Sequence, residues 1–177
     1  MNLKFSLLVF LFLFFAASVF SQEKSRKQIR EERATEKKIN TEAMIDAREF
    51  VFVGQIAMPT GYKSINLTTN PNYVNFHPDL IESYMPFYGR AYSGVGFGGD
   101  NGLKFKGKPE DYKVVKGPKN FQIDATIKGT NDFYKLSLIV SFDGSASLSI
   151  TSNNRSFISY KGEITAPEKP GEKNGNP

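Results

Sequence analysis

The chain has no cysteine, no tryptophan and a single histidine among its 177 residues. Without cysteine it forms no disulfides and offers no thiolate to a metal or a substrate, so its stability must come from a packed core. With His77 as the only imidazole, the ligands and bases of most metal sites and catalytic triads are missing. The sequence therefore predicts no cofactor and no metal, and it favours a protein that is not an enzyme.

The chain also lacks a large excess of charge of either sign. It has 23 Lys and Arg and 18 Asp and Glu, for a formal net charge of +5. A surplus this small, spread along the whole chain, does not form the basic surface that nucleic-acid binding needs. The sequence therefore predicts no nucleic-acid partner.

The one long hydrophobic run lies at the N-terminus. Lys4 is followed by apolar residues 5–15 and then by small residues up to Ser21, which is the pattern of a secretory signal peptide. Val19 and Ser21 are small enough for the two positions that a signal peptidase reads, so cleavage is expected after Ser21. We expect a periplasmic or secreted protein whose partner is an unknown ligand or an envelope protein. The alternative is a retained anchor over residues 5–20, which is short beside the roughly 20 residues of a bilayer span.

The rest of the chain divides by composition into a charged segment, a folded domain and a tail. Residues 22–38 are nearly all charged or polar and cannot bury an apolar face, so they form a charged helix or tether. Basic residues within 24–38 can also contact acidic lipid headgroups at a membrane surface. Residues 39–165 are expected to form a β-domain, and residues 166–177, rich in Pro, Gly and Lys, a disordered tail.

The β-domain is expected to open with a short helix whose docking face carries Ile39, Ala43, Ala47 and Phe50. After Glu49, apolar residues alternate with polar ones or form short runs bounded by Gly, Pro, Asn and Asp, as strands do. The predicted strands cover residues 50–57, 64–68, 73–77, 80–84, 89–94, 102–106, 111–116, 120–128, 133–142, 145–151 and 157–164. The residues predicted to face the core are Phe121, Ile123, Ala125, Ile127, Leu136, Leu138, Val140, Leu148 and Ile150.

Short turns such as Asp143-Gly144 join successive strands, which makes the sheet antiparallel. The predicted fold is all-β, a single antiparallel β-barrel or β-sandwich domain preceded by a charged N-terminal helix. The sequence does not choose between barrel and sandwich.

The most distinctive segment, residues 83–102, joins an aromatic stretch to a run of glycines. If strand alternation continues through it, tyrosine hydroxyls and a guanidinium share one face, which suits a sugar, an aromatic ligand or a protein partner. The predicted ligand-binding residues are Tyr84, Tyr88, Arg90, Tyr92 and Phe97. The alternative is that the tyrosines cap an edge of the core and Arg90 pairs with a nearby carboxylate.

The glycine run, residues 94–99, formally matches the G-x-G-x-x-G fingerprint of dinucleotide-binding proteins. That motif works only where the glycines open a helix whose amides hold the pyrophosphate. Here Asp100-Asn101-Gly102 follows and a strand pattern resumes. The sequence therefore predicts a loop rather than a nucleotide site.

Two other functions stay open beside ligand binding. An envelope-associated hydrolase would use His77 with Asp79 and either Ser83 or Ser93, yet no nucleophile elbow or oxyanion loop accompanies them. Carboxylate pairs such as Glu82 with Asp79, or Asp100 with Asp111, are equally formal possibilities. A structural accessory protein would dock through its charged N-terminal helix. No catalytic residue is assigned.

The segment Tyr84-Met85-Pro86-Phe87-Tyr88-Gly89-Arg90-Ala91-Tyr92 resembles the domain of unknown function DUF4251, found in exported proteins of Bacteroidetes-type bacteria. The resemblance spans roughly residues 47–164, with further matches at residues 50–52, 59–61, 66–67, 73, 105, 143–148, 155, 158–160 and 162. Met85 stands where leucine is usual, and Phe87-Tyr88 inverts the commoner order. The resemblance implies a secreted or periplasmic domain and brings no activity, cofactor or catalytic residue.

Overall fold

The computed structural model describes residues 25–69, 71–92, 102–130 and 132–167. The predicted signal peptide, the glycine run with Phe97, and residues 168–177 of the predicted tail lie outside them. The chain divides into two compact units, residues 1–35 and 36–177, which are described separately. Within the described residues, no helix has both the length and the apolar character that crossing a bilayer requires.

Helix α2 (Arg26–Ala47) supplies the described part of the first unit and the beginning of the second. Its N-terminus is closed by a capping box, in which Ser25 Oγ accepts the Lys27 amide at 3.2 Å and Gln28 Oε1 accepts the Ser25 amide at 3.0 Å. Residues 26–40 are exposed apart from the half-buried Ile29. The helix is therefore exposed to solvent over residues 26–40.

The C-terminal half of α2 packs on the β-domain through a face different from the predicted one. Thr41 and Ile45 are buried and Met44 lies against the core, whereas Ile39 is 60% exposed and Ala43 is also exposed. The prediction was wrong because the alanines offer little area, while the neighbouring face presents the larger Met44 and Ile45 side chains.

The helix ends through backbone bonds from Arg48 N–H to the Ile45 carbonyl and from Glu49 N–H to the Met44 carbonyl, at 3.1 and 3.2 Å. This is a Schellman motif. Arg48 takes the left-handed conformation that glycine usually supplies, with φ of 56°, and its guanidinium lies 4.6 Å from the centre of the Tyr112 ring.

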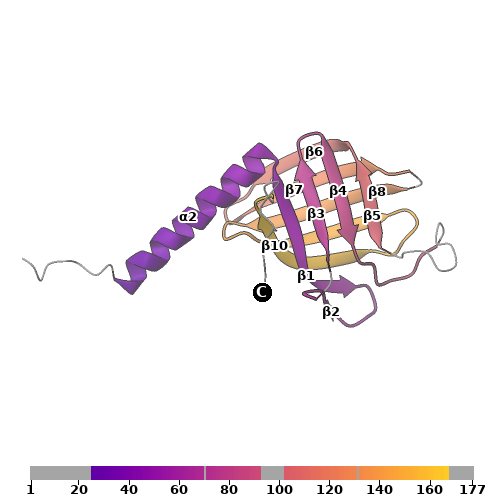
Figure 1. The fold of residues 1–177 in the computed structure, drawn as a ribbon, viewed down its shortest axis with the longest axis horizontal. Coiled ribbons are helices and arrows are strands. Elements are labelled where there is room, and N and C mark those ends of the chain that lie inside the picture. Colours follow the sequence, from indigo (N-terminus) through magenta and orange to yellow (C-terminus); the bar gives the residue numbers. More distant parts are fainter. Residues whose placement is uncertain (1–24, 70, 93–101, 131, 168–177) are drawn as a thin grey trace, which may run out of the picture. The chain divides into compact units, whose positions relative to one another are not determined.

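Ten antiparallel strands form one sheet in the part of the chain that the structure describes (Figure 1). They are β1 (Phe50–Pro59), β2 (Ile65–Asn66), β3 (Tyr73–His77), β4 (Leu80–Met85), β5 (Leu103–Gly107), β6 (Pro109–Lys116), β7 (Asn120–Lys128), β8 (Phe133–Ser141), β9 (Ser145–Ser152) and β10 (Ile158–Thr165). Their order is β5-β4-β3-β1-β10-β9-β8-β7-β6, with the short β2 beside β1. The all-β prediction is confirmed.

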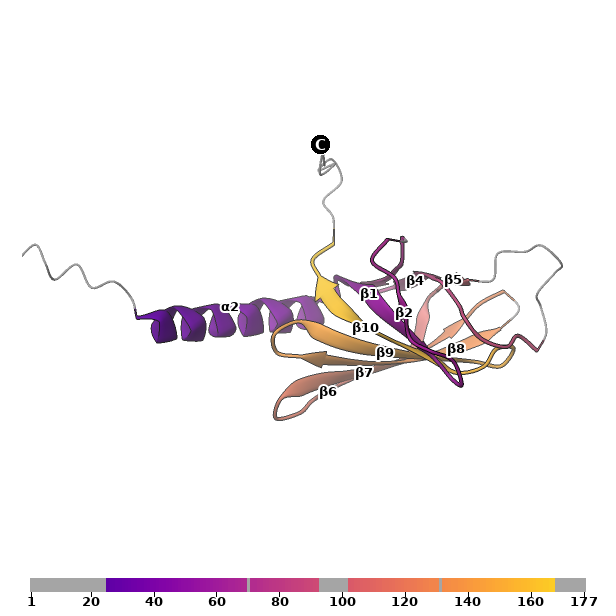
Figure 2. The same ribbon diagram turned by 90° about the horizontal axis from the view of Figure 1, so that it is seen from below.

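The sheet curls into a nearly closed barrel, so that β1, β4 and β5 face β6 to β9 across the core (Figure 2). Only Lys108 separates β5 from β6, so one bent stretch of chain pairs with β4 in its first half and with β7 in its second. At the bend, a Cβ on Gly107 would lie 2.9 Å from Ile127 Cγ2. Phe105 of β5 stacks on Tyr134 of β8, with ring centres 4.1 Å apart. These contacts bring the two ends of the sheet together.

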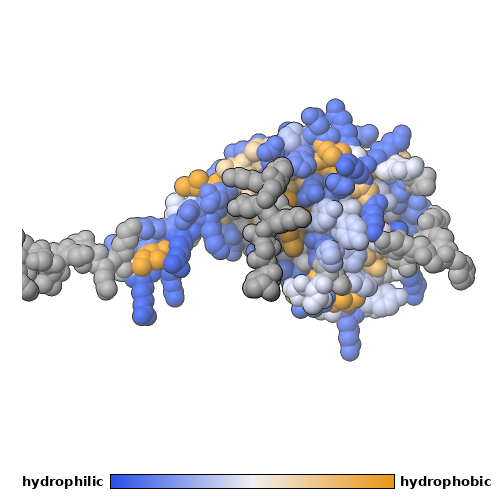
Figure 3. Space-filling view, viewed as in Figure 1, coloured by the Kyte–Doolittle hydropathy of each residue, from blue (hydrophilic) through white to orange (hydrophobic). Residues whose placement is uncertain are grey.

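The predicted core residues of β7, β8 and β9 are all buried, which confirms them. The other half of the barrel adds large side chains, among them Phe50 and Phe76, whose rings stack at 4.5 Å, and the fully buried Tyr160. Outward positions are polar for the most part. The visible face of the described residues is accordingly hydrophilic with separate hydrophobic patches (Figure 3).

The strand predicted at residues 89–94 is not formed over its described part. β4 ends at Met85, because Pro86 has no amide hydrogen to continue the ladder with β5. Beyond it only an isolated bridge joins Ala91 to Arg155.

Candidate functional site

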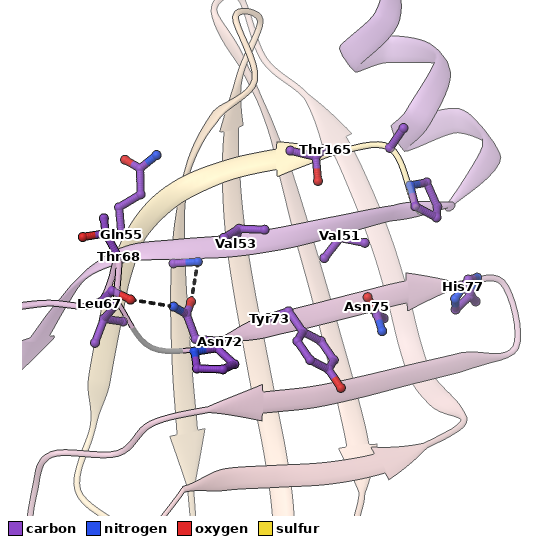
Figure 4. A pocket seen from close by; sticks show the side chains of 14 residues that line it. Val51, Val53, Gln55, Leu67, Thr68, Asn72, Tyr73, Asn75, His77 and Thr165 are labelled. Carbon is purple, nitrogen blue, oxygen red and sulfur yellow. Dashed lines mark hydrogen bonds between the residues drawn. The ribbon is translucent and has the colours of Figure 1, made fainter. Parts of the chain in front are cut away.

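A break in the sheet lies beside the middle of β1. One edge of β1 pairs with β3 at residues 50–52 and with β2 at residues 56–57, which leaves Val53, Gly54 and Gln55 without a strand on that side. The buried Asn72 fills the break: its Oδ1 accepts the Gly54 amide at 2.7 Å and its Nδ2 donates to the Leu67 carbonyl at 3.3 Å (Figure 4).

A Cβ on Gly54 would lie 2.7 Å from Asn72 Oδ1 and 3.0 Å from Met85 Cε, so a larger residue would have to displace the Asn72 amide that fills the break. The Leu67 amide also donates to the Gln55 carbonyl at 2.9 Å. The segment after β2 is thus fixed to β1 by main-chain and amide bonds.

A groove of about 800 Å³ opens on the outer face of the sheet over this region. Its floor is made by Val51 and Val53 of β1 and by Tyr73, Asn75 and His77 of β3, whose side chains stand on the same side of the sheet (Figure 4). The segment around Thr68 and Pro71 bounds it along one side, and residues 165–167 along the other.

Strand register continues this floor across the outer face. Asn75 lies opposite Val51 on one side and Glu82 on the other, and Glu82 in turn lies opposite Lys106. Glu82 Oε2 and Lys106 Nζ are 3.5 Å apart, so these two charges neutralise each other beside the groove.

A second row is aromatic and begins at Tyr73 on the groove floor. The Tyr73 and Tyr84 rings are stacked with centres 5.8 Å apart and an interplanar angle of 18°. Lys104 Nζ lies 4.0 Å from the centre of the Tyr84 ring. The stack with Tyr84 restricts the orientation of the Tyr73 ring, and the ammonium group of Lys104 lies on Tyr84.

The five predicted ligand-binding residues are divided between different parts of the structure. Tyr84 is 39% exposed and stands next to the groove through its stack with Tyr73. Tyr88 packs partly buried against the core, while Arg90 and Tyr92 are exposed in the loop after β4. Phe97 lies outside the described residues.

The loop that carries Arg90 and Tyr92 is attached to the β9–β10 turn by its backbone. Arg90 N–H donates to Ser156 Oγ at 3.1 Å, its carbonyl accepts the Ser156 amide at 2.9 Å, and Tyr92 N–H donates to the Asn154 carbonyl at 2.7 Å. The main chain of Arg90 and Tyr92 therefore has a structural role, because it joins the loop after β4 to the β9–β10 turn.

Tyr160 holds the other end of the same loop. Its buried hydroxyl donates to the Pro86 carbonyl at 2.7 Å, and burial raises the pKa of this hydroxyl well above its ordinary value. The Arg155 guanidinium lies 5.2 Å from the centre of the Phe87 ring. A Cβ on Gly89 would lie 2.5 Å from Ser156 Oγ, so a larger residue would have to displace the hydroxyl that accepts the Arg90 amide.

The geometry does not assemble the Ser83, His77 and Asp79 triad. Ser83 is 3% exposed, faces the barrel interior and donates to the Leu103 carbonyl at 2.8 Å. His77 is exposed on the opposite, outer face, since successive residues of a strand point to opposite sides. Ser93 and Asp100 lie outside the described residues. Among the described residues no group of three or more His, Asp and Glu is placed to hold a metal ion.

Sequence reasoning missed the residues that form the groove: Val51, Val53, Asn72, Tyr73 and Asn75. One signal was present, because Tyr73, Asn75 and His77 alternate with Val74 and Phe76 and therefore share the outer face of their strand. The remaining lining residues come together only through the pairing of β1 with β3.

The fold and the groove define a small antiparallel β-barrel domain with a concave surface on its outer wall. The chain belongs to the family described as domain of unknown function (DUF4251), whose model matches residues 32–164. The resemblance stated from the sequence is thereby confirmed.

One solved structure illustrates the shared fold. The crystal structure of a DUF4251 family protein from Bacteroides eggerthii DSM 20697 is similar with a TM-score of 0.58 and 19% sequence identity, over 73% of this chain and 87% of that one. At this identity the likeness concerns the fold alone. No curated protein matches the chain.

Proposed function

We propose that the chain is an exported, non-enzymatic binding domain that holds a small ligand in the groove over β1 and β3. The groove itself carries this proposal, because its volume of about 800 Å³ falls within the range typical of small-molecule sites, about 300–1,000 Å³. It also combines an apolar floor of Val51 and Val53 with polar groups at Asn75 and His77, which is the usual composition of such sites.

The position of the groove supports binding without large rearrangement. Its floor is carried by β1 and β3, which lie inside the sheet between β10 and β4, although Val53 stands at the break beside β1. Side chains on inner strands are held more firmly than side chains on loops, so less conformational freedom is lost when a ligand binds.

The face of the molecule that carries the groove also favours a small ligand over a broad protein interface. On the visible face of the described residues the hydrophobic patches are separate rather than continuous (Figure 3). Protein-binding surfaces are more often marked by one large contiguous apolar patch.

Export belongs to the same proposal and has its own test. If residues 1–21 are a signal peptide, protein purified from the periplasm or medium begins at Gln22 by N-terminal sequencing and is released from membranes by carbonate. Protein that keeps these residues and resists carbonate extraction would instead support the anchor over residues 5–20.

The binding proposal is tested by nuclear magnetic resonance on ¹⁵N-labelled mature chain, residues 22–177. The probes are the neutral trisaccharides chitotriose, maltotriose and cellotriose, together with laurate and inorganic phosphate. We expect at least one probe to shift the amide signals of β1 and β3. Asn75→Trp, which fills the groove, should abolish these shifts.

Gln122→Trp is the matched control, because it replaces an exposed amide side chain on β7, away from the groove, with the same bulky ring. It should leave the shifts intact. The proposal is wrong if no probe shifts the groove signals, or if Asn75→Trp responds as fully as the wild type.

A further inference from the structure

We infer that the ligand of this groove is an uncharged carbohydrate that stacks on the ring of Tyr73, an inference that rests on the proposed function. It follows from three properties of the lining: its lack of charged groups, its amides and hydroxyls, and its single oriented aromatic ring.

The lining of the groove is almost free of charge. None of the 14 described residues that line it is Asp, Glu, Lys or Arg, and His77 is the only imidazole among those 14. In the whole chain 23% of residues are charged, so an average set of this size would hold about three. A site for phosphate or carboxylate normally supplies Lys or Arg, so the groove is not built for an anion.

Charged side chains also border the groove on the same rows of the sheet. Glu163 of β10 lies opposite Val53, and its Oε1 accepts a hydrogen bond from Gln55 Nε2 at 3.3 Å. Glu82 pairs with Lys106 at 3.5 Å, and Lys104 lies over the Tyr84 ring at 4.0 Å. The groove floor is thus bordered by one ion pair, one lysine over an aromatic ring and one carboxylate bonded to a neutral amide, while the lining itself carries none of these charges.

Apart from the His77 imidazole, the polar side chains that line the groove are amides and hydroxyls. Asn75 and Thr165 stand on either side of Val51 in the cross-strand register, and Thr68 lies at the opposite end. An amide both donates and accepts, as does a hydroxyl, and sugar hydroxyls require both kinds of partner. A fatty acyl chain would bury these groups without partners, at a cost of about 1–3 kcal/mol each.

The aromatic ring is fixed in place. Tyr73 is half-buried in the groove and its ring stacks on Tyr84 at 5.8 Å, which limits its rotation. The C–H faces of sugar rings pack on aromatic rings, and a ring held in one orientation loses little entropy on binding. Val51 and Val53 extend the apolar surface beside it.

The test is isothermal titration calorimetry with chitotriose, maltotriose and cellotriose, and with laurate and inorganic phosphate for comparison. We expect at least one trisaccharide to bind, with a Kd that is the same at low and at high salt, because no charge pair is formed. Tyr73→Ala should weaken this binding by about tenfold or more, which corresponds to 1.4 kcal/mol, and Tyr73→Phe should stay within about threefold of the wild type.

Tyr92→Ala is the control for loss of a tyrosine, since Tyr92 is 68% exposed in the loop that follows β4. It should leave sugar affinity unchanged. If Tyr92→Ala weakens binding as much as Tyr73→Ala, the sugar is bound at that loop and the inference is wrong. If Tyr73→Ala fails to fold by circular dichroism, Asn75→Leu is used instead, and it should weaken sugar binding several-fold through loss of the amide.

The inference and the proposed function fail in different ways. Binding of laurate or phosphate in the groove, without any of the three sugars, overturns the carbohydrate inference and leaves a ligand-binding domain. If all five probes leave the β1 and β3 signals unshifted, both are overturned.

Discussion

Gly162 occupies a point in the sheet at which no side chain fits. A Cβ there would lie 1.9 Å from the Val53 carbonyl oxygen and 3.0 Å from Gly54 Cα. Because both neighbours are main-chain atoms of β1, they cannot move aside without breaking strand pairing. We predict that Gly162→Ala lowers the free energy of unfolding by about 3 kcal/mol, measured by urea denaturation.

Gly61 provides the comparison for this prediction. It has a φ of 79° and nothing within 4 Å of its Cβ position, so Gly61→Ala meets conformational strain without a clash. Its cost should be about 1 kcal/mol. Equal losses for the two variants would mean that the space around Gly162 is not the limiting factor.

Two buried tyrosine hydroxyls differ in having a partner. Tyr160 donates to the Pro86 carbonyl at 2.7 Å, whereas the buried hydroxyl of Tyr112 has no hydrogen-bond partner among the residues that the structure describes. We predict that Tyr160→Phe destabilises the protein by about 1–2 kcal/mol and that Tyr112→Phe is neutral or stabilising, both by thermal and urea unfolding. The opposite order would show that the Tyr160 bond does not hold the loop after β4.

Tyr112 also makes stability depend on pH in the alkaline range. Burial raises the pKa of its hydroxyl from 10.0 to about 12, against a smaller lowering by Arg48. Because the pKa of Tyr112 is higher in the folded state than in the unfolded state, its contribution to stability is present below the unfolded pKa. That contribution is lost as pH rises through the folded pKa. Tyr112→Phe should therefore reduce the loss of stability between about pH 10 and pH 12.

Among the elements, the β8–β9 hairpin is closed by a charged turn. Asp143 Oδ1 accepts the Ser145 hydroxyl at 2.6 Å and the Ser145 amide at 3.0 Å, which together lower the pKa of the carboxyl. Because the pKa of Asp143 is lower in the folded state, the ionised carboxyl stabilises the protein above its unfolded pKa of 3.8. This stabilisation is lost as pH falls through the folded pKa.

We predict that Asp143→Asn costs about 0.5–1 kcal/mol near neutral pH, since the turn is largely solvated. Well below pH 3.8 the variant and the wild type should differ much less. Denaturant unfolding at both pH values measures the difference, and Asp79→Asn in the exposed β3–β4 turn is the control. A cost that does not change with pH would contradict the role of the ionised carboxyl.

The strands were predictable wherever local pattern and turns agree. β3 and β7 have the bounds expected from alternation, and Asp143-Gly144 forms the expected hairpin turn, with Gly144 at a φ of 89°. The segment after Pro86 was not predictable in this way. Its apolar alternation continues, with Phe87 buried, but its main chain is held by residues 154–156 rather than by a neighbouring long strand.

The groove was less predictable than the strands because it depends on which strands become neighbours. Asn72 and Gly54 are separated by 18 residues, and nothing local indicates that the amide of one fills a break beside the other. The face shared by Tyr73 and Asn75 could be expected from alternation. That Val51 lies next to it follows from the pairing of β1 with β3, which sequence pattern alone does not fix.

For the whole molecule, barrel closure depends on the contact between β5 and β8. Phe105 is 7% exposed and stacks on Tyr134 at 4.1 Å. We predict that Phe105→Ala lowers the free energy of unfolding by about 3–5 kcal/mol and speeds hydrogen exchange in β5 and β7 more than in β9 and β10.

Phe133→Ala is the matched control, because Phe133 begins the same strand as Tyr134 but is 43% exposed. Its cost should be below about 1 kcal/mol. If hydrogen exchange rises equally in all strands after Phe105→Ala, the contact between β5 and β8 contributes to general stability and not to closure.

The pairing of β1 with β10 has a consequence for how the chain folds. The first strand of the barrel, β1, pairs with the last, β10, with Val51 opposite Thr165 and Phe52 opposite Ile164. Such distant partners make folding slow compared with local hairpins. A chain that leaves a ribosome or a membrane channel N-terminus first must keep one edge of β1 unpaired until its final strand emerges, and during that interval this edge is open to aggregation.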